Sequence, residues 1–290
     1  MTVLLGSYRQ AASLIWSALN ALNDMSSVFG AGIRKFHVYS IPENILYSGY
    51  NMRPETCPFF MYSSEIVVPE LIKRHSSLYE SSPDKAKFYV VPQFSTCFYH
   101  FCLQEAGNNV EICKEKTQKY FDDIVDWVEE KYPYWNQNGG NDHVFVFSWD
   151  QGSEILGHNS PTHHRIQSCI HLVHHGKRVA DDSNYISQKD VIIPVYRDYF
   201  ALDRLSGKHM ERKIFAYFRG TIENSEHIYG HGVRRFIKYL GQTKPTKYFV
   251  KEGHNEFYWN EISRSTFTLC PPGWSLWSPR LYDAILAGSI

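Results

Sequence analysis

From about residue 34 onward, short apolar runs alternate with segments in which apolar residues recur at helical spacing. The apolar runs predict strands at 36–39, 88–91, 144–147, 214–218 and 247–250. The helical segments are 62–75, 120–132, 233–240 and 256–263. Short apolar strands alternating with amphipathic helices are typical of a parallel sheet covered on both faces. The pattern therefore predicts an α/β fold.

Prolines, a glycine and a charged stretch indicate where these elements bend or end. Pro69 is expected to kink the first helix, and Gly241 is expected to close the helix that begins near Val233. Tyr132-Pro133 is expected to end the helix whose apolar face carries Tyr120, Phe121, Ile124, Val125 and Val128. The charged, weakly periodic stretch 197–213 is a candidate boundary between two domains.

The segment 266–288 has the most specific pattern in the chain. It reads as a short strand, a Gly/Pro loop, and a helix with Ser278 as N-cap and Pro279 at its first position. Arg280 would add a guanidinium to the anion-binding N-terminus of this helix, and Asp283 could accept hydrogen bonds from sugar hydroxyls. These features fit a nucleotide-sugar site, although an ordinary strand–loop–helix with a surface arginine fits the spacing equally well.

Composition limits the classes of partner. The 290 residues carry 30 Lys+Arg and 30 Asp+Glu, so no net charge favours nucleic acid or an anionic membrane. The modestly apolar stretch 14–22 is far shorter than the ~20 apolar residues of a membrane span. The 45 aromatic residues (20 Tyr, 18 Phe and 7 Trp) suit stacking on sugars, but packing within the core also explains them.

The run FTLCPPGWSLWSPRLYDAILAG, at 267–288, resembles the C-terminal signature of the exostosin-like glycosyltransferases, family 47. Further segments match in the same order: KFHVYSIPENI (35–45), DKAKFYVVPQFSTC (84–97), YPYWNQNGGNDHVFVFSWDQG (132–152), DVIIPVY (190–196) and IFAYFRGTIENSEHIYGHGVRR (214–235). The likeness is greatest to the plant branch that includes the xylan xylosyltransferases.

This resemblance implies a GT-B architecture, in which two Rossmann-like domains face each other across a cleft. The implied division is a poorly defined segment 1–33, an acceptor-side domain 34–205 and a nucleotide-sugar-binding domain 206–290. Family members continue beyond the position of Ile290, so the second domain is expected to be incomplete. The family also implies a lumenal Golgi location, although residues 1–33 show no membrane anchor.

The implied donor site contains Arg219 and Gly220 after the strand IFAYFRG, with Gly273 in the signature loop. Ser278, Arg280 and Asp283 complete it; Asp283 stands where the family has Glu. A structural ion pair is the alternative role for Arg219. On the acceptor side, Asp150 is the candidate general base and Glu154 the fallback. Capping of the following helix is the alternative for Asp150.

The histidines and cysteines raise the questions of a metal site and of a disulfide. His158, His163, His164, His171, His174 and His175 could suggest a metal, but they form no H-E-x-x-H motif and His171 is expected on a strand. We therefore expect no metal and no cofactor besides the sugar donor. If the protein is lumenal, the resemblance suggests a disulfide between Cys57 and Cys97. The alternative is that these cysteines are buried free thiols.

The leading hypothesis is an inverting transferase that moves a sugar from a UDP-sugar to a polysaccharide or glycan, with xylose and xylan suggested by the branch. A homo-oligomer or a complex with another glycosyltransferase would fit the family. The alternative is a non-catalytic, truncated or degenerate partner of such an enzyme. A zinc hydrolase that uses the histidines is a weaker third hypothesis.

Overall fold

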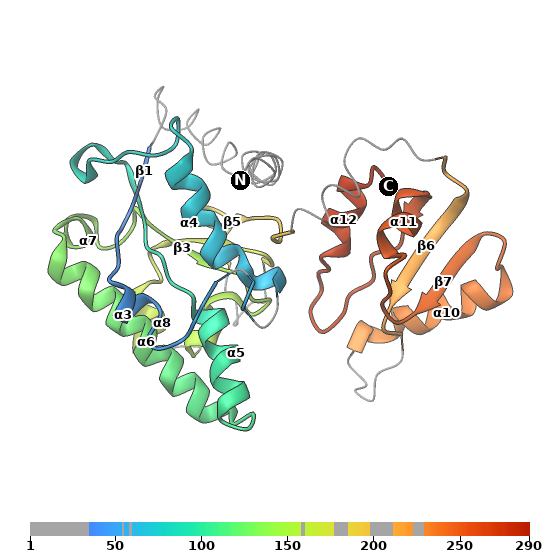
Figure 1. The fold of residues 1–290 in the computed structure, drawn as a ribbon, viewed down its shortest axis with the longest axis horizontal. Coiled ribbons are helices and arrows are strands. Elements are labelled where there is room, and N and C mark those ends of the chain that lie inside the picture. Colours follow the sequence, from blue (N-terminus) through green and yellow to red (C-terminus); the bar gives the residue numbers. More distant parts are fainter. Residues whose placement is uncertain are drawn as a thin grey trace. The chain divides into compact units, whose positions relative to one another are not determined.

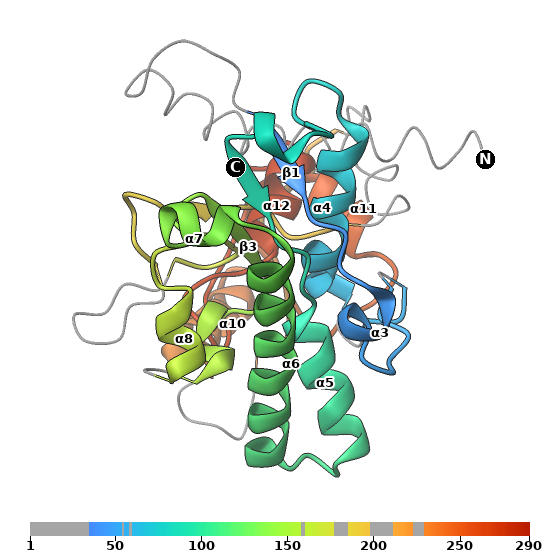
Figure 2. The same ribbon diagram turned by 90° about the vertical axis from the view of Figure 1, so that its left-hand side faces the viewer.

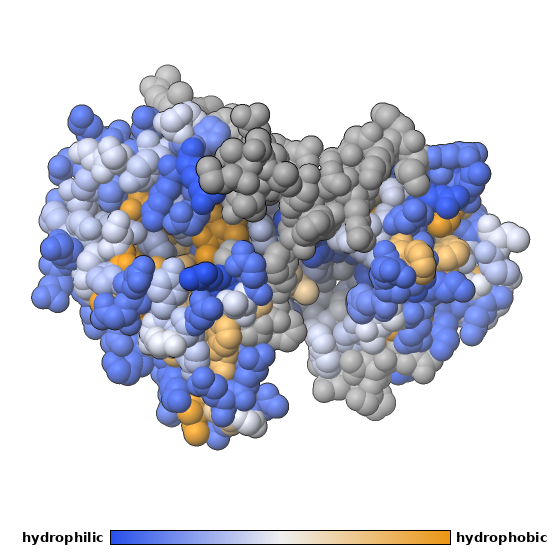
Figure 3. Space-filling view, viewed as in Figure 1, coloured by the Kyte–Doolittle hydropathy of each residue, from blue (hydrophilic) through white to orange (hydrophobic). Residues whose placement is uncertain are grey.

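The computed structural model describes residues 35–53, 55–57, 60–157, 160–176, 185–197, 211–222 and 229–290. It divides into two compact units, which meet in the sequence between Tyr196 and Arg197 (Figure 1). The expected domain boundary at 205–206 lies outside the described residues, as does the expected N-terminal segment 1–33. Hydrophilic residues cover most of the visible face of each unit, and apolar residues appear as separate patches (Figure 3).

The first unit contains a parallel sheet in the order β1-β2-β3-β4-β5. Its strands are β1 (Phe36–Val38), β2 (Phe88–Val90), β3 (His143–Phe147), β4 (Ile170–Val173) and β5 (Val191–Ile192). The helices and 3-10 turns between them are α3 (Glu43–Leu46), η1 (Phe60–Ser63), α4 (Ser64–Arg74), η2 (Pro83–Lys85), α5 (Ser95–Glu105), α6 (Val110–Lys131), α7 (Tyr134–Asn138), η3 (Gly152–Leu156) and α8 (Pro161–Arg165).

The central strand β3 is buried on both of its faces, so the sheet of this unit lies between two layers. Successive side chains of a strand point to opposite faces, and all five residues of β3 are buried. On one face, Phe145 and Phe147 contact Phe121 of α6, with ring centroids 5.2 and 5.9 Å apart. The sheet is therefore covered on both sides, as the continuous apolar run predicted. The apolar face predicted for α6 is also confirmed, since its five predicted residues are all buried.

Helices α5 and α6 form an antiparallel pair beside the sheet (Figure 2). A disulfide between Cys102 and Cys113 joins them. A second disulfide, between Cys57 and Cys97, joins the segment before η1 to α5. The Cys57–Cys97 disulfide confirms the pairing that the resemblance suggested, whereas no pattern in the sequence pointed to the Cys102–Cys113 disulfide.

The second unit contains a parallel sheet in the order β7-β6-β8. Its elements are β6 (Ile214–Gly220), η4 (Tyr229–Gly232), α10 (Val233–Thr243), β7 (Tyr248–Glu252), α11 (Tyr258–Ser263), β8 (Ser265–Thr268) and α12 (Arg280–Leu286). Tyr217 packs with α11 and α12, whereas its neighbour Phe218 packs with Ile237 of α10. Because adjacent strand residues face opposite ways, these helices cover opposite faces (Figure 1).

One local prediction needs correction. Helix α10 continues through Gly241 to Thr243. A Cβ at Gly241 would lie 2.6 Å from the Val250 side chain of β7, so this glycine allows the helix to approach the sheet instead of ending the helix. Pro69 lies within α4 (Ser64–Arg74), and the kink expected at this residue stays a prediction.

Candidate functional site

The candidate site of the second unit lies where β6 and β8 end. Both strands run in the same direction, so their carboxyl ends share one edge of the sheet. Ligands of open parallel sheets bind at this edge. Gly220 is the last residue of β6, and the loop 269–279 follows β8. The residues of the signature segment are therefore placed at the edge where the sequence predicted a site.

Arg234, at the start of α10, projects into this edge. It is 6% exposed. Its Nε donates a hydrogen bond to the carbonyl oxygen of Pro272 (2.7 Å), and its Nη1 donates to the carbonyl oxygen of Thr221 (2.6 Å) and the hydroxyl of Tyr229 (2.7 Å). Its guanidinium also lies over the Tyr229 ring, 4.5 Å from the centroid. Neutral oxygens and an aromatic face therefore hold Arg234.

Arg280, at the start of α12, reaches the same edge from the other side of the loop. It is 7% exposed. Its Nη2 donates to the carbonyl oxygen of Arg219 (2.9 Å), and its Nη1 to the Ser278 hydroxyl (3.3 Å). Its Nε is buried and has no hydrogen-bond partner within the described part of the chain. The guanidinium lies 4.7 Å from the centroid of the Phe218 ring, over which Arg234 is also placed, at 5.7 Å.

The two guanidiniums are thus neighbours over the same aromatic ring. Across the described residues, neither Arg234 nor Arg280 forms an ion pair. Burial and the charge of Arg280 lower the pKa of Arg234. Desolvation and the charges of Arg280, Arg234 and Arg219 also lower the pKa of His254. Burying like charges together is costly unless an anion offsets them, so this arrangement suits a ligand of negative charge.

Two glycines predicted to let the backbone approach phosphate make room for these guanidiniums. An ideal Cβ at Gly220 would lie 2.8 Å from Arg280 Nη2 and 3.9 Å from Arg234 Nη1. A Cβ at Gly273 would lie 3.2 Å from Arg234 Nη2. Gly220 also has φ of +156°, which other residues rarely adopt. Both glycines therefore belong to the candidate site. In this structure the groups that lie close to them are arginine side chains.

Arg219 forms a structural ion pair, which was the alternative to a role in donor binding. Its Nε and Nη2 donate to the two carboxylate oxygens of Glu261, at 2.6 and 2.7 Å. Tyr217 donates to the same carboxylate at 2.9 Å. Although burial acts in the opposite direction, the hydrogen bonds from Arg219 and Tyr217 lower the pKa of Glu261. The side chain of Arg219 thus links β6 to α11, while its carbonyl oxygen orients Arg280.

Asp283 is likewise bound by protein groups. Its Oδ1 accepts from Arg197 Nε (2.7 Å), and its Oδ2 accepts from Arg197 Nη2 (2.9 Å) and from the Tyr258 hydroxyl (2.8 Å). The Asp283 residue is 2% exposed. A ribose hydroxyl would have to displace one of these donors, so Asp283 in this structure fixes α12 to Arg197 and α11.

The start of α12 differs slightly from the prediction. The helix begins at Arg280 with Pro279 in the N-cap position, one residue later than expected. The Ser278 hydroxyl still accepts a hydrogen bond from the Arg280 backbone N–H at 3.3 Å. With only seven residues in α12, the positive charge at this edge comes mainly from the arginine side chains.

In the first unit, Asp150 follows β3 and Glu154 lies in η3. The Tyr62 hydroxyl donates to Asp150 Oδ1 at 3.4 Å, and His175 Nδ1 lies 3.2 Å from the Asp150 carbonyl oxygen. Asp150 is half-buried. The structure therefore places this carboxylate at the carboxyl edge of the first sheet, beside a tyrosine that sequence reasoning did not select.

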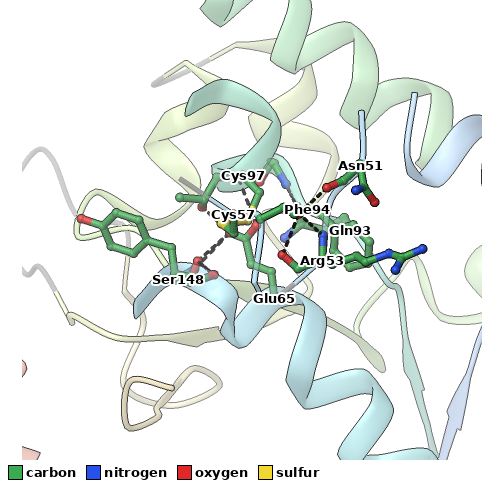
Figure 4. The surroundings of a disulfide bond; sticks show 12 residues. Asn51, Arg53, Cys57, Glu65, Gln93, Phe94, Cys97 and Ser148 are labelled. Carbon is green, nitrogen blue, oxygen red and sulfur yellow. Dashed lines mark hydrogen bonds between the residues drawn. A yellow bond between two sulfur atoms is a disulfide. The ribbon is translucent and has the colours of Figure 1, made fainter. Parts of the chain in front are cut away.

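Glu65 of α4 is a buried carboxylate that the sequence did not reveal. It accepts hydrogen bonds from the backbone N–H and hydroxyl of Thr96, and from the backbone N–H (3.2 Å) and hydroxyl (3.0 Å) of Ser148. Figure 4 shows Glu65 and Ser148 close to the Cys57–Cys97 disulfide. Burial raises the pKa of Glu65 to about 7, against the opposing effect of these hydrogen bonds. Glu65 thus joins α4, α5 and the end of β3.

The histidines have separate local partners. His171 lies on β4, as expected, with Nε2 3.1 Å from the Ile166 carbonyl oxygen. His163 Nε2 lies 3.2 Å from the Ser153 hydroxyl, and His174 Nε2 lies 2.8 Å from the Ser64 hydroxyl. His158 lies outside the described residues. Among the residues that are described, no group of three His, Cys, Asp or Glu could hold a metal ion.

His143 lies at the start of β3. Its Nδ1 is 2.9 Å from Asp142 Oδ1 and its Nε2 is 3.0 Å from the Tyr39 hydroxyl. The part of the chain seen in the structure also contains no helix long and apolar enough to cross a membrane.

Comparison with known proteins identifies the family. The exostosin GT47 domain matches residues 33–290, which is most of the chain. The chain belongs to the exostosin GT47 family. The ordered motifs of the sequence are thus those of this family, and its α/β fold with parallel sheets is consistent with a glycosyltransferase.

The named relatives of this GT47 chain are plant proteins. A probable glucuronosyltransferase of Oryza sativa subsp. japonica is 27% identical over 248 residues, covering 81% of this chain and 55% of the relative. A probable glucuronoxylan glucuronosyltransferase of Arabidopsis thaliana is 26% identical over 309 residues, covering 99% and 62%. A second Arabidopsis protein of that description is 25% identical, covering 88% and 58%. The chain therefore spans about three fifths of these relatives. Their names do not support the xylosyltransferase branch.

Arg234 is the main functional candidate that sequence reasoning missed. It lies in the matched segment IFAYFRGTIENSEHIYGHGVRR, beside the exposed Arg235. Helical spacing places Arg234 on the face of α10 that carries Ile237, and both are buried. An arginine on the apolar face of an amphipathic helix was therefore an available signal.

Proposed function

We propose that this chain carries the sugar-transferring part of a glycosyltransferase that uses a UDP-sugar donor and a polysaccharide acceptor. The observation that carries the proposal is the pair of buried guanidiniums, Arg234 and Arg280, which form no ion pair with a carboxylate of the described residues. A departing nucleoside diphosphate bears the negative charge that such a pair would stabilise. Membership of the exostosin GT47 family supports this reaction class.

In this proposal, Arg280 and Arg234 bind the diphosphate. The Nε of Arg280, unpartnered among the described residues, is an available donor, and Arg234 Nη2 faces Gly273. Gly220 and Gly273 keep this edge open, while the Arg219–Glu261 pair and Ser278 hold the positions of the binding groups. Asp283 contributes by fixing the start of α12, and binding of ribose by Asp283 would require exchange of Arg197 or Tyr258.

For the acceptor, we assign Asp150 as general base, with Glu154 as the alternative. Asp150 would remove the proton from an acceptor hydroxyl, whose oxygen attacks the anomeric carbon of the donor. The bond from that carbon to the diphosphate oxygen breaks, and its electron pair leaves on UDP. Attack from the face opposite the leaving group inverts the anomeric configuration. We expect no metal requirement, because guanidiniums would neutralise the leaving group.

The finer identity of the substrates follows from relatives and resemblance together. The relatives are named as glucuronosyltransferases, two of them of glucuronoxylan, whereas the motifs resemble the xylosyltransferase branch. We therefore propose UDP-glucuronic acid or UDP-xylose as donor and a xylan-type chain as acceptor. A GT-B arrangement, a lumenal Golgi location and association with another glycosyltransferase complete the proposal.

Calorimetric titration with UDP tests the donor site. Arg280→Met and Arg234→Met should each weaken UDP binding by at least about tenfold, because each removes a charge-assisted contact. Arg235→Met is the matched control, since Arg235 is exposed on the same helix and undergoes the same change of charge. Equal affinity in the wild-type protein and both buried-arginine variants would overturn the assignment.

A further inference from the structure

Four rings form one cluster at the carboxyl edge of the first sheet, and one of them, Tyr62, contacts Asp150. Tyr62 comes from η1, Tyr99 and His100 come from α5, and Trp149 directly follows Ser148 at the end of β3. The Tyr62 and His100 rings are stacked, with centroids 5.7 Å apart and planes 3° apart. Trp149 lies 5.4 Å from Tyr99 and 6.0 Å from His100. Three elements distant in sequence thus form one aromatic cluster.

The cluster is partly open and has a polar end. Tyr62, His100 and Trp149 are half-buried, while Tyr99 is buried beneath them. The Tyr62 hydroxyl donates to Asp150 Oδ1. Burial lowers the pKa of His100 to about 4, despite the opposing effect of Asp150, so its imidazole is neutral at physiological pH.

Covalent and hydrogen-bonded links hold the ring-bearing segments in place. The Cys57–Cys97 disulfide connects the segment before Tyr62 to α5, less than one helical turn from His100. The Glu65 carboxylate binds Thr96 of α5 and Ser148, the residue before Trp149 (Figure 4). The Ser148 hydroxyl also donates to the Tyr62 carbonyl oxygen at 2.7 Å. A rigid frame of this kind preorganises a binding surface.

We propose that Trp149, His100 and Tyr62, supported by Tyr99, bind a neutral sugar ring of the acceptor and present its hydroxyl to Asp150. This inference rests on the proposed transferase function. Partly exposed aromatic rings offer apolar faces with polar edges, which match a sugar ring whose C–H groups face one way and whose hydroxyls point outward. The Asp150 carboxylate would disfavour an anionic ligand, so the cluster fits a neutral acceptor unit and not the nucleotide diphosphate.

Binding of the acceptor at the aromatic cluster and binding of UDP at the arginine pair can be measured separately. Trp149→Ala should weaken binding of xylohexaose, and raise its KM, by about tenfold. The affinity for UDP should stay unchanged, because its proposed site lies in the other unit. Trp149→Phe keeps an aromatic face and should stay within about threefold of the wild-type protein. Trp127→Ala is the matched control, since Trp127 is another half-buried indole packed on the same core.

The two proposals fail in different ways. If the wild-type protein binds UDP and transfers sugar, but Trp149→Ala keeps the wild-type KM and affinity for xylohexaose, the aromatic subsite is wrong and the transferase function stands. Equal losses in Trp149→Ala and Trp127→Ala would also overturn the subsite, because they would reflect disturbance of the core. If the wild-type protein neither binds UDP nor transfers sugar, the proposed function itself is wrong.

Discussion

The guanidinium of Arg280 occupies the space that a side chain at Gly220 would need. Its Nη2 lies 2.8 Å from the ideal Cβ position of Gly220 and donates to the carbonyl oxygen of the preceding residue, Arg219. Position 220 therefore needs a glycine for two reasons: its φ is +156°, and any side chain there would clash with the Arg280 guanidinium. This relationship links the end of β6 to the start of α12 and sets the geometry of the candidate donor site.

Gly220→Ala should displace the Arg280 guanidinium and weaken UDP binding by at least about tenfold, which calorimetry can measure. Gly253→Ala is the control. Gly253 also has positive φ, at +79°, but a Cβ there meets nothing within 4 Å. Strain alone should therefore affect both variants, and loss of UDP affinity should appear only at Gly220. Equal UDP affinity in the two variants would show that Arg280 does not depend on this space.

Pyrophosphate should stabilise the protein against heat. An anion that binds Arg234 and Arg280 favours the folded state, by about 2.7 kcal/mol at a hundredfold excess over its dissociation constant. A thermal-unfolding series with increasing pyrophosphate at constant ionic strength measures this effect. Arg280→Met should reduce the rise in Tm, whereas Arg235→Met should retain it. A rise of the same size in both variants would indicate non-specific screening.

Asp283→Asn should lower the free energy of unfolding by about 3 kcal/mol, because it leaves the largely buried Arg197 guanidinium without its bidentate partner. Denaturant unfolding measures the change. The double variant Arg197→Met/Asp283→Asn should lose less than the sum of the single changes, since it leaves no unpaired charge. Strict additivity would mean that the two groups are not coupled in solution.

Glu65 should make stability depend on pH. Its pKa is about 7 in the folded protein and near 4.5 when unfolded, so the folded state binds more protons between these values. The free energy of unfolding should therefore fall by about 3 kcal/mol as pH rises from 4.5 to 7.

Comparison with Glu65→Gln isolates this effect. The lowered pKa of His100 acts in the opposite direction, because this histidine stabilises the fold as pH rises from about 4 to 6.5. His100 contributes equally in both proteins, so urea unfolding across this range should show a declining difference between them. Parallel curves would show that Glu65 does not titrate in this window.

The two disulfides should contribute unequally. The Cys57–Cys97 bridge closes a separation of 40 residues and the Cys102–Cys113 bridge one of 11. In the chain-entropy account, their removal costs about 4 and about 3 kcal/mol. Denaturant unfolding of the paired serine variants compares them. A larger loss for Cys102→Ser/Cys113→Ser would indicate that folded-state contacts, rather than unfolded-chain entropy, determine their effect.

The sequence by itself determined many of the strands and helices, though not α5 or β5, and the edge at which the candidate site lies. The apolar run 144–147 predicted a strand buried on both faces, and the spacing from Tyr120 to Val128 predicted the packed face of α6. These are local patterns, since burial of alternate or helically spaced residues depends mainly on neighbours in the chain. The strand IFAYFRG also placed Gly220 at the end of β6, and the signature segment placed Gly273 and Arg280 after β8.

Only the tertiary structure decided which charged groups are paired. Arg219 is bound to Glu261, 42 positions away, and Asp283 to Arg197, 86 positions away, so neither partner can be read from local spacing. The same folding brings Arg234 beside Arg280 and leaves both without a carboxylate partner among the residues that the structure describes. It also gathers Tyr62, His100 and Trp149 into one cluster. Side chains meet across a sheet through the packing of whole elements, and this packing determines their charge environment and their chemistry.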